Sequence, residues 1–348
     1  MTMSFSQSLR RVSSPATAAA LTLGIVAASL AFSSPASAQS SSCADAVTGA
    51  PQGPATVSVR STAHGRALVV GSGRYTGCSL YLLTSDQLHA LTGAPFACSD
   101  NLNPLGAANP CDTVLWPALL TQGAPVAGPG IKPKLLGTVT RTDLPGLPAV
   151  QQVTYAGHPL YRFFLDEVPG ETEGANLDDP VTSPAGVWYL VNPRGIPAPG
   201  QAQLRLETAP LDSTGPAETV LAARMNNDFH VFPNVSFPVY ILSVDNGDQS
   251  GDARSREVGG ESACQGQCAV YWPPVLTSQE PQAGPGVEQN ALGITVRSDG
   301  SHQVTYDGQP LYVFNKDAYI AGIAGTQGIN GTGALTPWGV FNTIPPLP

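Results

Sequence analysis

Charged residues are scarce in this chain, and long helical patterns are missing as well. Only 12% of its 348 residues are Asp, Glu, Lys or Arg, whereas Gly (37) and Pro (33) are abundant. Gly and Pro interrupt helices and favour turns. The composition therefore predicts short strands joined by many turns. Disorder is not predicted, because aromatic and branched apolar residues recur in ordered patterns.

Signatures of catalysis and of metal binding are also absent. The sequence has no Gly-x-Ser-x-Gly elbow, phosphate-binding loop or dinucleotide fingerprint. Its five His form no His-x3-His or His–Cys cluster. Two acidic stretches, 171–179 and 245–252, are rich enough in oxygen for Ca²⁺ but lack EF-hand spacing, so solvated surface is favoured for both. We expect no cofactor and no metal, although this excludes only enzymes that need such motifs.

Positive charge is in deficit. The chain has 16 basic and 25 acidic residues, a net charge of −9. Loss of an N-terminal signal carrying Arg10 and Arg11 leaves 14 basic and 25 acidic residues, a net charge of −11. Such a surface repels nucleic acid and anionic membranes, so neither is an expected partner.

No segment of the chain reaches the roughly 20 apolar residues of a membrane helix. The N-terminus instead reads as a signal peptide, 1–38: a short basic region, an apolar stretch at 17–32, and small residues before a cleavage point after Ala38. General secretion is favoured over twin-arginine export. Cys43 lacks the apolar residue that a lipid-anchor site requires before it. We expect a monomer without a transmembrane segment, secreted or held in the cell envelope.

Six Cys in an exported chain predict three disulfides. Fifteen pairings are possible, but a repeat in the sequence favours bonds within each half. The expected pairs are Cys264 with Cys268, Cys98 with Cys111 and, by elimination, Cys43 with Cys78. A redox role for the Cys-x3-Cys segment is a weaker alternative, because redox motifs usually have two intervening residues.

The second half of the chain repeats the first. QVTYAGHPLYRFFLD at 152–166 matches QVTYDGQPLYVFNKD at 303–317. Trp188-x3-Asn192 is paired in the same way with Trp338-x3-Asn342. A period this long indicates two copies of one structural unit.

A shorter signature occurs four times, as a Tyr followed five positions later by an Asp. Two copies also have a Phe two positions after the Tyr. These repeat-motif residues are Tyr81 and Asp86; Tyr161, Phe163 and Asp166; Tyr240 and Asp245; and Tyr312, Phe314 and Asp317. The favoured interpretation is structural, each Asp ending a strand and accepting turn amides. The alternative pairs two of them as the acid and base of a hydrolase, which requires carboxyls about 5–10 Å apart.

Local patterns predict the elements around these motifs. Residues 153–155 and 304–306 are strands, each followed by a turn, and Asp307-Gly308 is a strong hairpin signal. Ala156-Gly157 predicts a different turn type. The return segments 159–164 and 310–314 are apolar on both faces, which predicts interior strands. VWYLVN and WGVFN predict closing strands. The segments CAVYWPP and CDTVLWP are ambiguous, and a helical turn ended by Pro273 is one interpretation of them.

Six large aromatic side chains could build a surface that stacks on a sugar or a peptide. A core position is favoured for all of them, because such residues more often pack inside. They are Trp116, Trp188, Trp272, Trp338, Tyr161 and Tyr312.

The repeated pattern resembles the bacterial secreted repeat of unknown function, whose members are described as predicted lipoproteins. Cys264 to Asp317 carries C-x3-C-A-x2-W-P-P and then L-G-x3-R-x-D-G-x2-Q-V-T-Y-x-G-x-P-L-Y-x-F-x2-D. The first half matches from Trp116 to Asp166. The motifs that begin at Tyr81 and Tyr240 differ from the family pattern, because they have Leu83 and Leu242 in place of an aromatic residue. The resemblance implies an exported envelope protein with no established activity.

These observations predict an all-β protein of four β-meander quasi-repeats in two tandem halves, propeller-like or arranged as paired barrels. The expected divisions are a signal peptide (1–38), a flexible leader (39–55), a first repeat domain (56–192), a linker (193–217) and a second repeat domain (218–348). The favoured function is non-catalytic binding of a cell-envelope polymer or a partner protein. The alternatives are a carboxylate-based hydrolase of extracellular polymer and a redox or metal-handling envelope protein.

Overall fold

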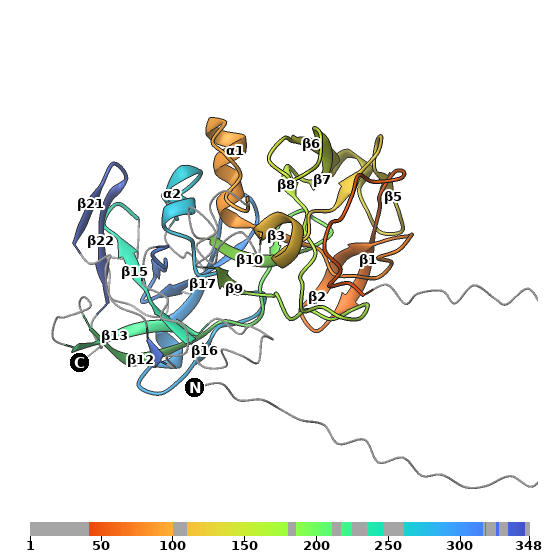
Figure 1. The fold of residues 1–348 in the computed structure, drawn as a ribbon. Coiled ribbons are helices and arrows are strands. Elements are labelled where there is room, and N and C mark those ends of the chain that lie inside the picture. The colour runs from red at the N-terminus through yellow and green to blue at the C-terminus, as the bar shows by residue number, and fades with distance from the viewer. Residues whose placement is uncertain are drawn as a thin grey trace, which may run out of the picture. The chain divides into compact units, whose positions relative to one another are not determined.

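The computed structural model describes residues 42–99, 110–179, 186–210, 217–224, 235–245, 261–315, 317, 325–326 and 333–344. Short β-strands dominate these residues, as the composition predicted (Figure 1). The predicted signal peptide, His230 and the acidic stretch from Asn246 to Asp252 lie outside the described residues.

Three small sheets make up the first half of the chain. Their orders are β2–β1–β5, with β5 parallel to β1; β4–β7–β6, with β8 also paired to β7; and β11–β10–β3, with β9 also paired to β10. The strands are β1 (Thr56–Thr62), β2 (Gly65–Val70), β3 (Tyr81–Leu83), β4 (Leu120–Thr121), β5 (Val126–Ala127), β6 (Leu136–Arg141), β7 (Val150–Tyr155), β8 (His158–Pro159), β9 (Leu177–Asp179), β10 (Gly186–Val191) and β11 (Pro197–Ala198).

Three further sheets make up the second half. Their orders are β16–β12–β13–β14–β20, with β16 parallel to β12; β17–β18–β19; and β15–β22–β21. The strands are β12 (Gln203–Pro210), β13 (Ala217–Arg224), β14 (Val235–Pro238), β15 (Tyr240–Leu242), β16 (Gln282–Ala283), β17 (Leu292–Val296), β18 (His302–Tyr306), β19 (Gln309–Pro310), β20 (Gly325–Thr326), β21 (Ala334–Thr336) and β22 (Gly339–Thr343).

The pairing pattern of one half recurs in the other. A hairpin that carries a short parallel strand (β1, β2 and β5) corresponds to β12, β13 and β16, and β6–β7–β8 corresponds to β17–β18–β19. The predicted all-β class is confirmed. The propeller-like or paired-barrel arrangement is not observed, since no sheet among the described strands closes on itself. Most sheets end in strands of two or three residues, so their hydrogen-bond ladders stop before the sheet can curve round.

Helices are short and few in the described part of the chain. None of them has the length and apolar character needed to cross a bilayer. The Cys segments, which were ambiguous in the sequence, form the helical turns η3 and α2. Helix α1, which follows the first Tyr–Asp motif, was not predicted; it ends at Gly93 with φ of 72°. The helical segments are η1 (Thr84–Asp86), α1 (Gln87–Thr92), η3 (Cys111–Leu115), η4 (Pro133–Leu135), α2 (Gln267–Tyr271) and η5 (Gln289–Ala291).

Two stretches that were expected to be connectors contain ordered structure. In the leader, 39–55, Cys43 is fully buried and bonded to Cys78. In the linker, 193–217, the whole of β12 pairs with β13 in register from Gln203↔Arg224 onward. The described strand pairing of the second half therefore begins at Gln203, well before residue 218.

The return segments after the two hairpins were expected to be interior strands. Tyr161 and Tyr312 are fully buried, which agrees with apolar surroundings on both sides. However, only the two-residue strands β8 and β19 continue the ladder, and each tyrosine then forms isolated bridges. Tyr161, for example, bridges Tyr81 and Ala118. Since the segment changes its pairing partner at the tyrosine, no long regular strand forms.

The Trp-x3-Asn spacing predicted that Trp188 and Trp338 are equivalent positions of the two repeats. This prediction was wrong by three positions. Trp188 lies in β10 and Phe341 in β22, at equivalent points of their sheets. They stack on Trp116 and Trp272 respectively, with ring centroids 3.7 Å apart in both cases. Trp338 lies in the turn before β22 and is only partly buried. The equivalent of Trp188 is therefore Phe341.

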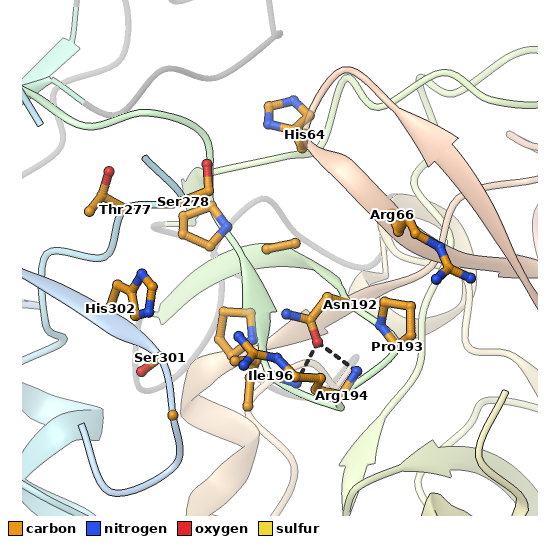
Figure 2. Close-up of a pocket in the computed structure, with 14 residues that line it drawn as sticks. His64, Arg66, Asn192, Pro193, Arg194, Ile196, Thr277, Ser278, Ser301 and His302 are labelled. Carbon is orange, nitrogen blue, oxygen red and sulfur yellow. Dashed lines mark hydrogen bonds between the residues drawn. The ribbon is translucent and has the colours of Figure 1, made fainter. Parts of the chain in front are cut away.

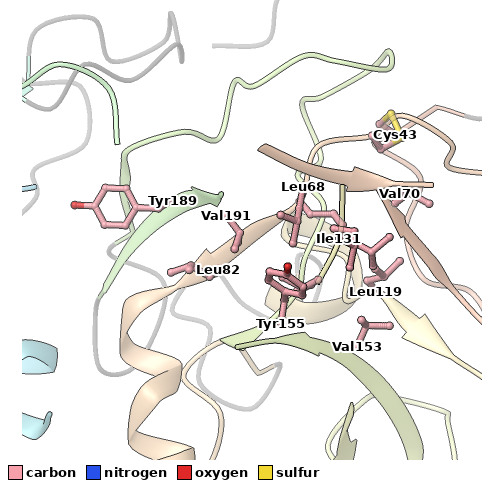
Figure 3. Close-up of a cluster of buried hydrophobic side chains, with 14 of the residues drawn as sticks. Cys43, Leu68, Val70, Leu82, Leu119, Ile131, Val153, Tyr155, Tyr189 and Val191 are labelled. Carbon is pink, nitrogen blue, oxygen red and sulfur yellow. A yellow bond between two sulfur atoms is a disulfide. The ribbon is translucent and has the colours of Figure 1, made fainter. Parts of the chain in front are cut away.

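Buried apolar clusters lie beneath these sheets. Figure 3 shows one cluster of the first half, in which Leu68, Leu82, Val153 and Val191 come from four different strands. Tyr189, also in this cluster, is 2% exposed. Packing across strands thus joins sheets that share few hydrogen bonds, because buried apolar area is the main stabilising term.

Both hairpin turns have the same backbone, contrary to the prediction from Ala156-Gly157. Ala156 and Gly157 have φ of 53° and 86°, and Asp307 and Gly308 have φ of 48° and 76°. Positive φ at both central residues is typical of a type I′ turn. Alanine is strained in this region because of its Cβ.

Substitution of Ala156 by Gly is expected to raise the free energy of unfolding by about 0.5–1 kcal/mol, because the strain is removed. Urea unfolding followed by circular dichroism measures this change. Ala67→Gly is the control: Ala67 is buried in β2, where Gly costs about 0.5–1 kcal/mol or more. Equal destabilisation by the two substitutions would contradict the turn assignment.

Candidate functional site

The Tyr–Asp motifs of the first half pair crosswise. The hydroxyl of Tyr81 donates to Asp166 Oδ2 at 2.7 Å, and that of Tyr161 donates to Asp86 Oδ2 at 2.6 Å. The backbones pair at the same point, with Tyr81 N to Tyr161 O at 2.9 Å and the reverse bond at 3.0 Å. Each tyrosine therefore bonds the aspartate of the other motif.

The second half repeats this exchange. The hydroxyl of Tyr240 donates to Asp317 Oδ2 at 2.8 Å, and that of Tyr312 donates to Asp245 Oδ2 at 2.7 Å. The reciprocal backbone bonds between Tyr240 and Tyr312 are 2.8 and 2.9 Å long. The four sequence motifs thus form two pairs, one pair in each half.

The second carboxylate oxygen of these aspartates accepts backbone amides. Asp86 Oδ1 accepts Ala97 N at 2.8 Å, and Asp245 Oδ1 accepts Ala263 N at 2.7 Å. Both amides directly precede a disulfide-bonded cysteine, Cys98 or Cys264. Asp166 Oδ1 instead accepts Glu173 N at 2.9 Å. The motif carboxylates therefore hold the Cys segments and neighbouring loops against the strands.

The motif aromatic residues cover the tryptophans of the Cys segments. Phe163 packs on Trp116 with centroids 4.2 Å apart, and Phe314 packs on Trp272 at 4.2 Å. Five of the six aromatics considered for a stacking surface are at most 2% exposed, and Trp338 alone is more exposed. A surface built from these five is therefore excluded.

A buried arginine, which the sequence reasoning did not single out, organises the first half. Arg141 is 0% exposed and donates to Gln152 Oε1 at 2.6 Å and to Cys98 O at 3.0 Å. It also pairs with two carboxylates, Asp112 at 2.5 Å and Asp143 at 2.7 Å. The charge is thus neutralised where it is removed from water, as a buried ion requires.

Arg297 occupies the matching place in the second half with a different set of partners. It donates to Gln303 Oε1 at 2.7 Å, Ser262 Oγ at 2.5 Å and Cys264 O at 2.7 Å. It also donates to Gln265 Oε1 at 3.1 Å. All four acceptors are neutral, so the two halves share the position of the guanidinium but not its direct ion pairs.

A second buried arginine of the first half ties down the N-terminal segment. Arg162 is 1% exposed and stacks on Tyr75, with the guanidinium carbon 3.6 Å from the ring centroid. It donates to Cys43 O and, at 2.8 Å, to Asp45 O. Burial lowers the pKa of Arg162 to about 10. Together with the Cys43–Cys78 bond, these contacts explain why the expected flexible leader is ordered from residue 42.

Burial shifts the titration of the motif groups. It raises the pKa of Asp166 to about 8, although the bonds from Tyr81 and Glu173 act in the opposite direction. It also raises the pKa of Asp86 and Asp245. The pKa of Tyr161 lies well above its usual value because of burial and the neighbouring Asp86. These shifts favour neutral Asp and Tyr side chains inside the fold.

Asp166→Asn is expected to flatten the dependence of stability on pH. The folded pKa of Asp166, about 8, exceeds its unfolded value of about 4. Its contribution is therefore complete below about pH 4 and is lost as the pH rises to about 8, at up to about 1.4 kcal/mol per unit. The amide of Asn mimics the protonated acid and removes this slope. Unfolding in urea at several pH values measures it, and parallel wild-type and variant curves would count against the assignment.

All six cysteines are paired, in the combination expected from the sequence. The bonds are Cys43–Cys78, Cys98–Cys111 and Cys264–Cys268. All six side chains are at most 1% exposed. A group of three or more His, Cys, Asp or Glu able to hold a metal is not found among the described residues.

A cavity of about 370 Å³, lined by both polar and apolar residues, lies away from the Tyr–Asp motifs (Figure 2). Its lining comes from the β1–β2 turn and the start of β2, from residues 192–199 after β10, and from segments 277–278 and 300–302 of the second half. None of the four motif aspartates lines it. This cavity could not be predicted from the sequence, since its four lining segments are far apart along the chain.

The repeated architecture and its buried signature define a disulfide-bonded β-protein with tandem repeats. Residues 150–192 and 293–332 both match the model of a protein family described as secreted repeat of unknown function. The resemblance inferred from the sequence is thereby confirmed, with one matching segment in each half of the chain. The family and the three disulfides identify an extracellular protein. No curated protein and no solved structure matches the chain.

Proposed function

We propose that this is a non-catalytic exported protein that binds an extracellular component, a cell-envelope polymer or a partner protein, through surface that the two repeats hold in place. One observation carries the proposal: in all four copies of the signature, the Tyr hydroxyl and the Asp carboxylate satisfy each other inside the fold. These groups connect the backbone around one Tyr–Asp motif to the backbone around another. Their chemistry is that of a scaffold, and binding would take place elsewhere.

The hydrolase alternative is less well supported. It needs two carboxyls facing a substrate-sized space, about 5–10 Å apart. Asp86 and Asp166 are 2% and 1% exposed, and Asp245 and Asp317 are both 6% exposed. None of them lines the larger cavities among the described residues. Substrate would have to displace the Tyr–Asp bonds to reach them.

The redox and metal-handling alternative is also less well supported. It requires sulfur that a partner thiol or a metal can reach. Cys264 and Cys268 are both 0% exposed, and the carbonyl of Cys264 is bound by Arg297. Their bond therefore serves to shape the segment that Arg297 and Asp245 hold.

A retention assay with residues 39–348 tests the proposal. The protein is mixed with isolated cell-wall and membrane fractions, and the bound fraction and any released reducing sugars are measured. The proposal expects saturable retention without release of products. Release of products that is abolished by Asp86→Asn or Asp166→Asn, in protein shown to be folded, would instead establish the hydrolase.

A further inference from the structure

We propose that the cavity of Figure 2 binds an anionic group, a carboxylate or a phosphate, on an extracellular glycan or polymer. This rests on the proposed function and assigns to it a place and a chemistry. The cavity, about 370 Å³, is within the usual range of small-ligand sites, about 300–1,000 Å³. It would therefore receive one part of a longer molecule.

The walls of the cavity are held by hydrogen bonds on both sides. Pro193 O accepts the hydroxyl of Tyr155 at 3.1 Å. This bond fixes residues 193–200, the connector that follows β10, to the first half. Gly200 O accepts Ser278 N at 3.2 Å, which fixes it to the second half. Proline at 193, 197 and 199 restricts the backbone between these points. A rigid wall reduces the entropy that binding would otherwise cost.

The charged lining of the cavity is entirely basic. Arg66 and Arg194 are exposed, and His64 and His302 complete the set, while no Asp or Glu is among the 14 lining residues. Within the described part of the chain, neither guanidinium forms a side-chain hydrogen bond or ion pair. In a chain of net charge −9, two uncompensated arginines at one cavity are unusual. Their donors are available to a ligand.

Neutral donors add to the same wall. The side-chain oxygen of Asn192 accepts Arg194 N at 2.8 Å and Ile196 N at 3.4 Å. This fixes the amide so that its NH₂ group remains as a donor, as Figure 2 shows. Ser278 contributes a hydroxyl. The side chains thus offer donors in excess of acceptors, which favours an anion.

The nearest carboxylate of the loop does not cancel this charge by a direct ion pair. Asp299 accepts the hydroxyl of Ser301 at 2.6 Å and its backbone N–H at 2.8 Å. It lines a neighbouring cavity and not this one. The net negative charge of the protein is spread over its surface and is screened within about 8 Å at physiological salt. A close anion therefore interacts mainly with the basic residues that line the cavity.

Arginine determines which anions fit best. Its planar guanidinium binds carboxylate and phosphate oxygens through two parallel hydrogen bonds. Both chemistries occur on extracellular polymers, as uronic acids and as phosphodiesters. The experiment below separates them.

Isothermal titration of residues 39–348 with three oligomers tests the site. The probes are an oligogalacturonate, a glycerol-phosphate oligomer and a neutral chitooligosaccharide. At least one anionic probe is expected to bind, and more weakly at higher salt, whereas the neutral probe is not. R66Q/R194Q is expected to weaken binding about tenfold or more. Failure of both anions to bind, or equal binding of the neutral probe, would overturn the proposal.

A charge-matched variant separates a local site from a general effect of charge. K132Q/K134Q also removes two positive charges, at exposed positions outside the cavity lining. It is expected to retain affinity within about threefold, because distant charges are screened. Equal weakening by both double variants would overturn the site. If envelope fractions retain R66Q/R194Q as well as they retain the wild-type protein, the anion site is overturned and the proposed function stands. If the fractions do not retain the wild-type protein but an anionic oligomer binds it tightly, the proposed function is overturned and the anion site stands.

Discussion

Replacement of Arg141 by Met is expected to lower the free energy of unfolding by about 3–5 kcal/mol. The substitution removes the ion pair between Arg141 and Asp112, which is 0% exposed, and it also removes the contact to Asp143. Removing one partner of a buried pair is costly because the other charge stays buried. Urea unfolding with intact disulfides measures the loss. Hydrogen exchange should locate it in the β6–β7 sheet and the Cys98–Cys111 segment.

Arg297→Met is the matched substitution in the second half. Its partners are neutral, so the variant leaves unsatisfied acceptors but no unpaired carboxylate. A loss of about 1–3 kcal/mol is expected. Equal losses of stability in the two halves would mean that the charge of Asp112 does not matter.

Trp188→Ala is expected to destabilise the protein by about 3–5 kcal/mol. Trp188 is fully buried, stacks on Trp116 and meets Tyr161 edge-on at 5.1 Å. Truncation removes this contact and leaves a cavity between two sheets. Thermal and urea unfolding measure the effect.

Two further substitutions test the register of the repeat. Phe341→Ala is expected to cost about 3–5 kcal/mol, because Phe341 is fully buried against Trp272. Trp338→Ala is expected to cost about 1 kcal/mol or less, since Trp338 is partly exposed in a turn. A larger loss of stability from Trp338→Ala than from Phe341→Ala would support Trp338, as the sequence predicted, as the equivalent of Trp188.

Much of the local structure could be predicted from the sequence. The strands at residues 153–155 and 304–306 and the disulfide pairs are encoded in patterns a few residues long or in the repeat itself. β12 was missed because the Pro- and Gly-rich stretch before it dominated the interpretation. The alternation of Leu204 and Leu206 with charged residues indicated a half-buried strand.

The crosswise pairing of the motifs could not be predicted. A Tyr and an Asp five positions apart suggest a local contact, whereas each hydroxyl bonds a carboxylate 67 to 85 residues away. Only tertiary structure decides which motif faces which. The buried arginines left a trace in the sequence, since both repeats carry Arg before the hairpin strand, but their partners come from the Cys segments.

The cavity is the feature that the sequence predicts least. Arg66 lies in strand β2 and His302 in strand β18, whereas Arg194 belongs to the connector that follows β10. Each one alone is an ordinary surface residue. Their common chemistry becomes visible only when the connector is bonded to both halves.

A double-mutant cycle for Tyr161→Phe and Asp86→Asn tests the central claim most directly, because it measures the free energy that couples two motifs across the fold. We expect a coupling of about 1–3 kcal/mol for this pair. The same cycle for Tyr161→Phe and Asp166→Asn, two residues of a single motif, should give about 0.5 kcal/mol or less. Coupling confined to the Tyr161 and Asp166 pair would contradict the account.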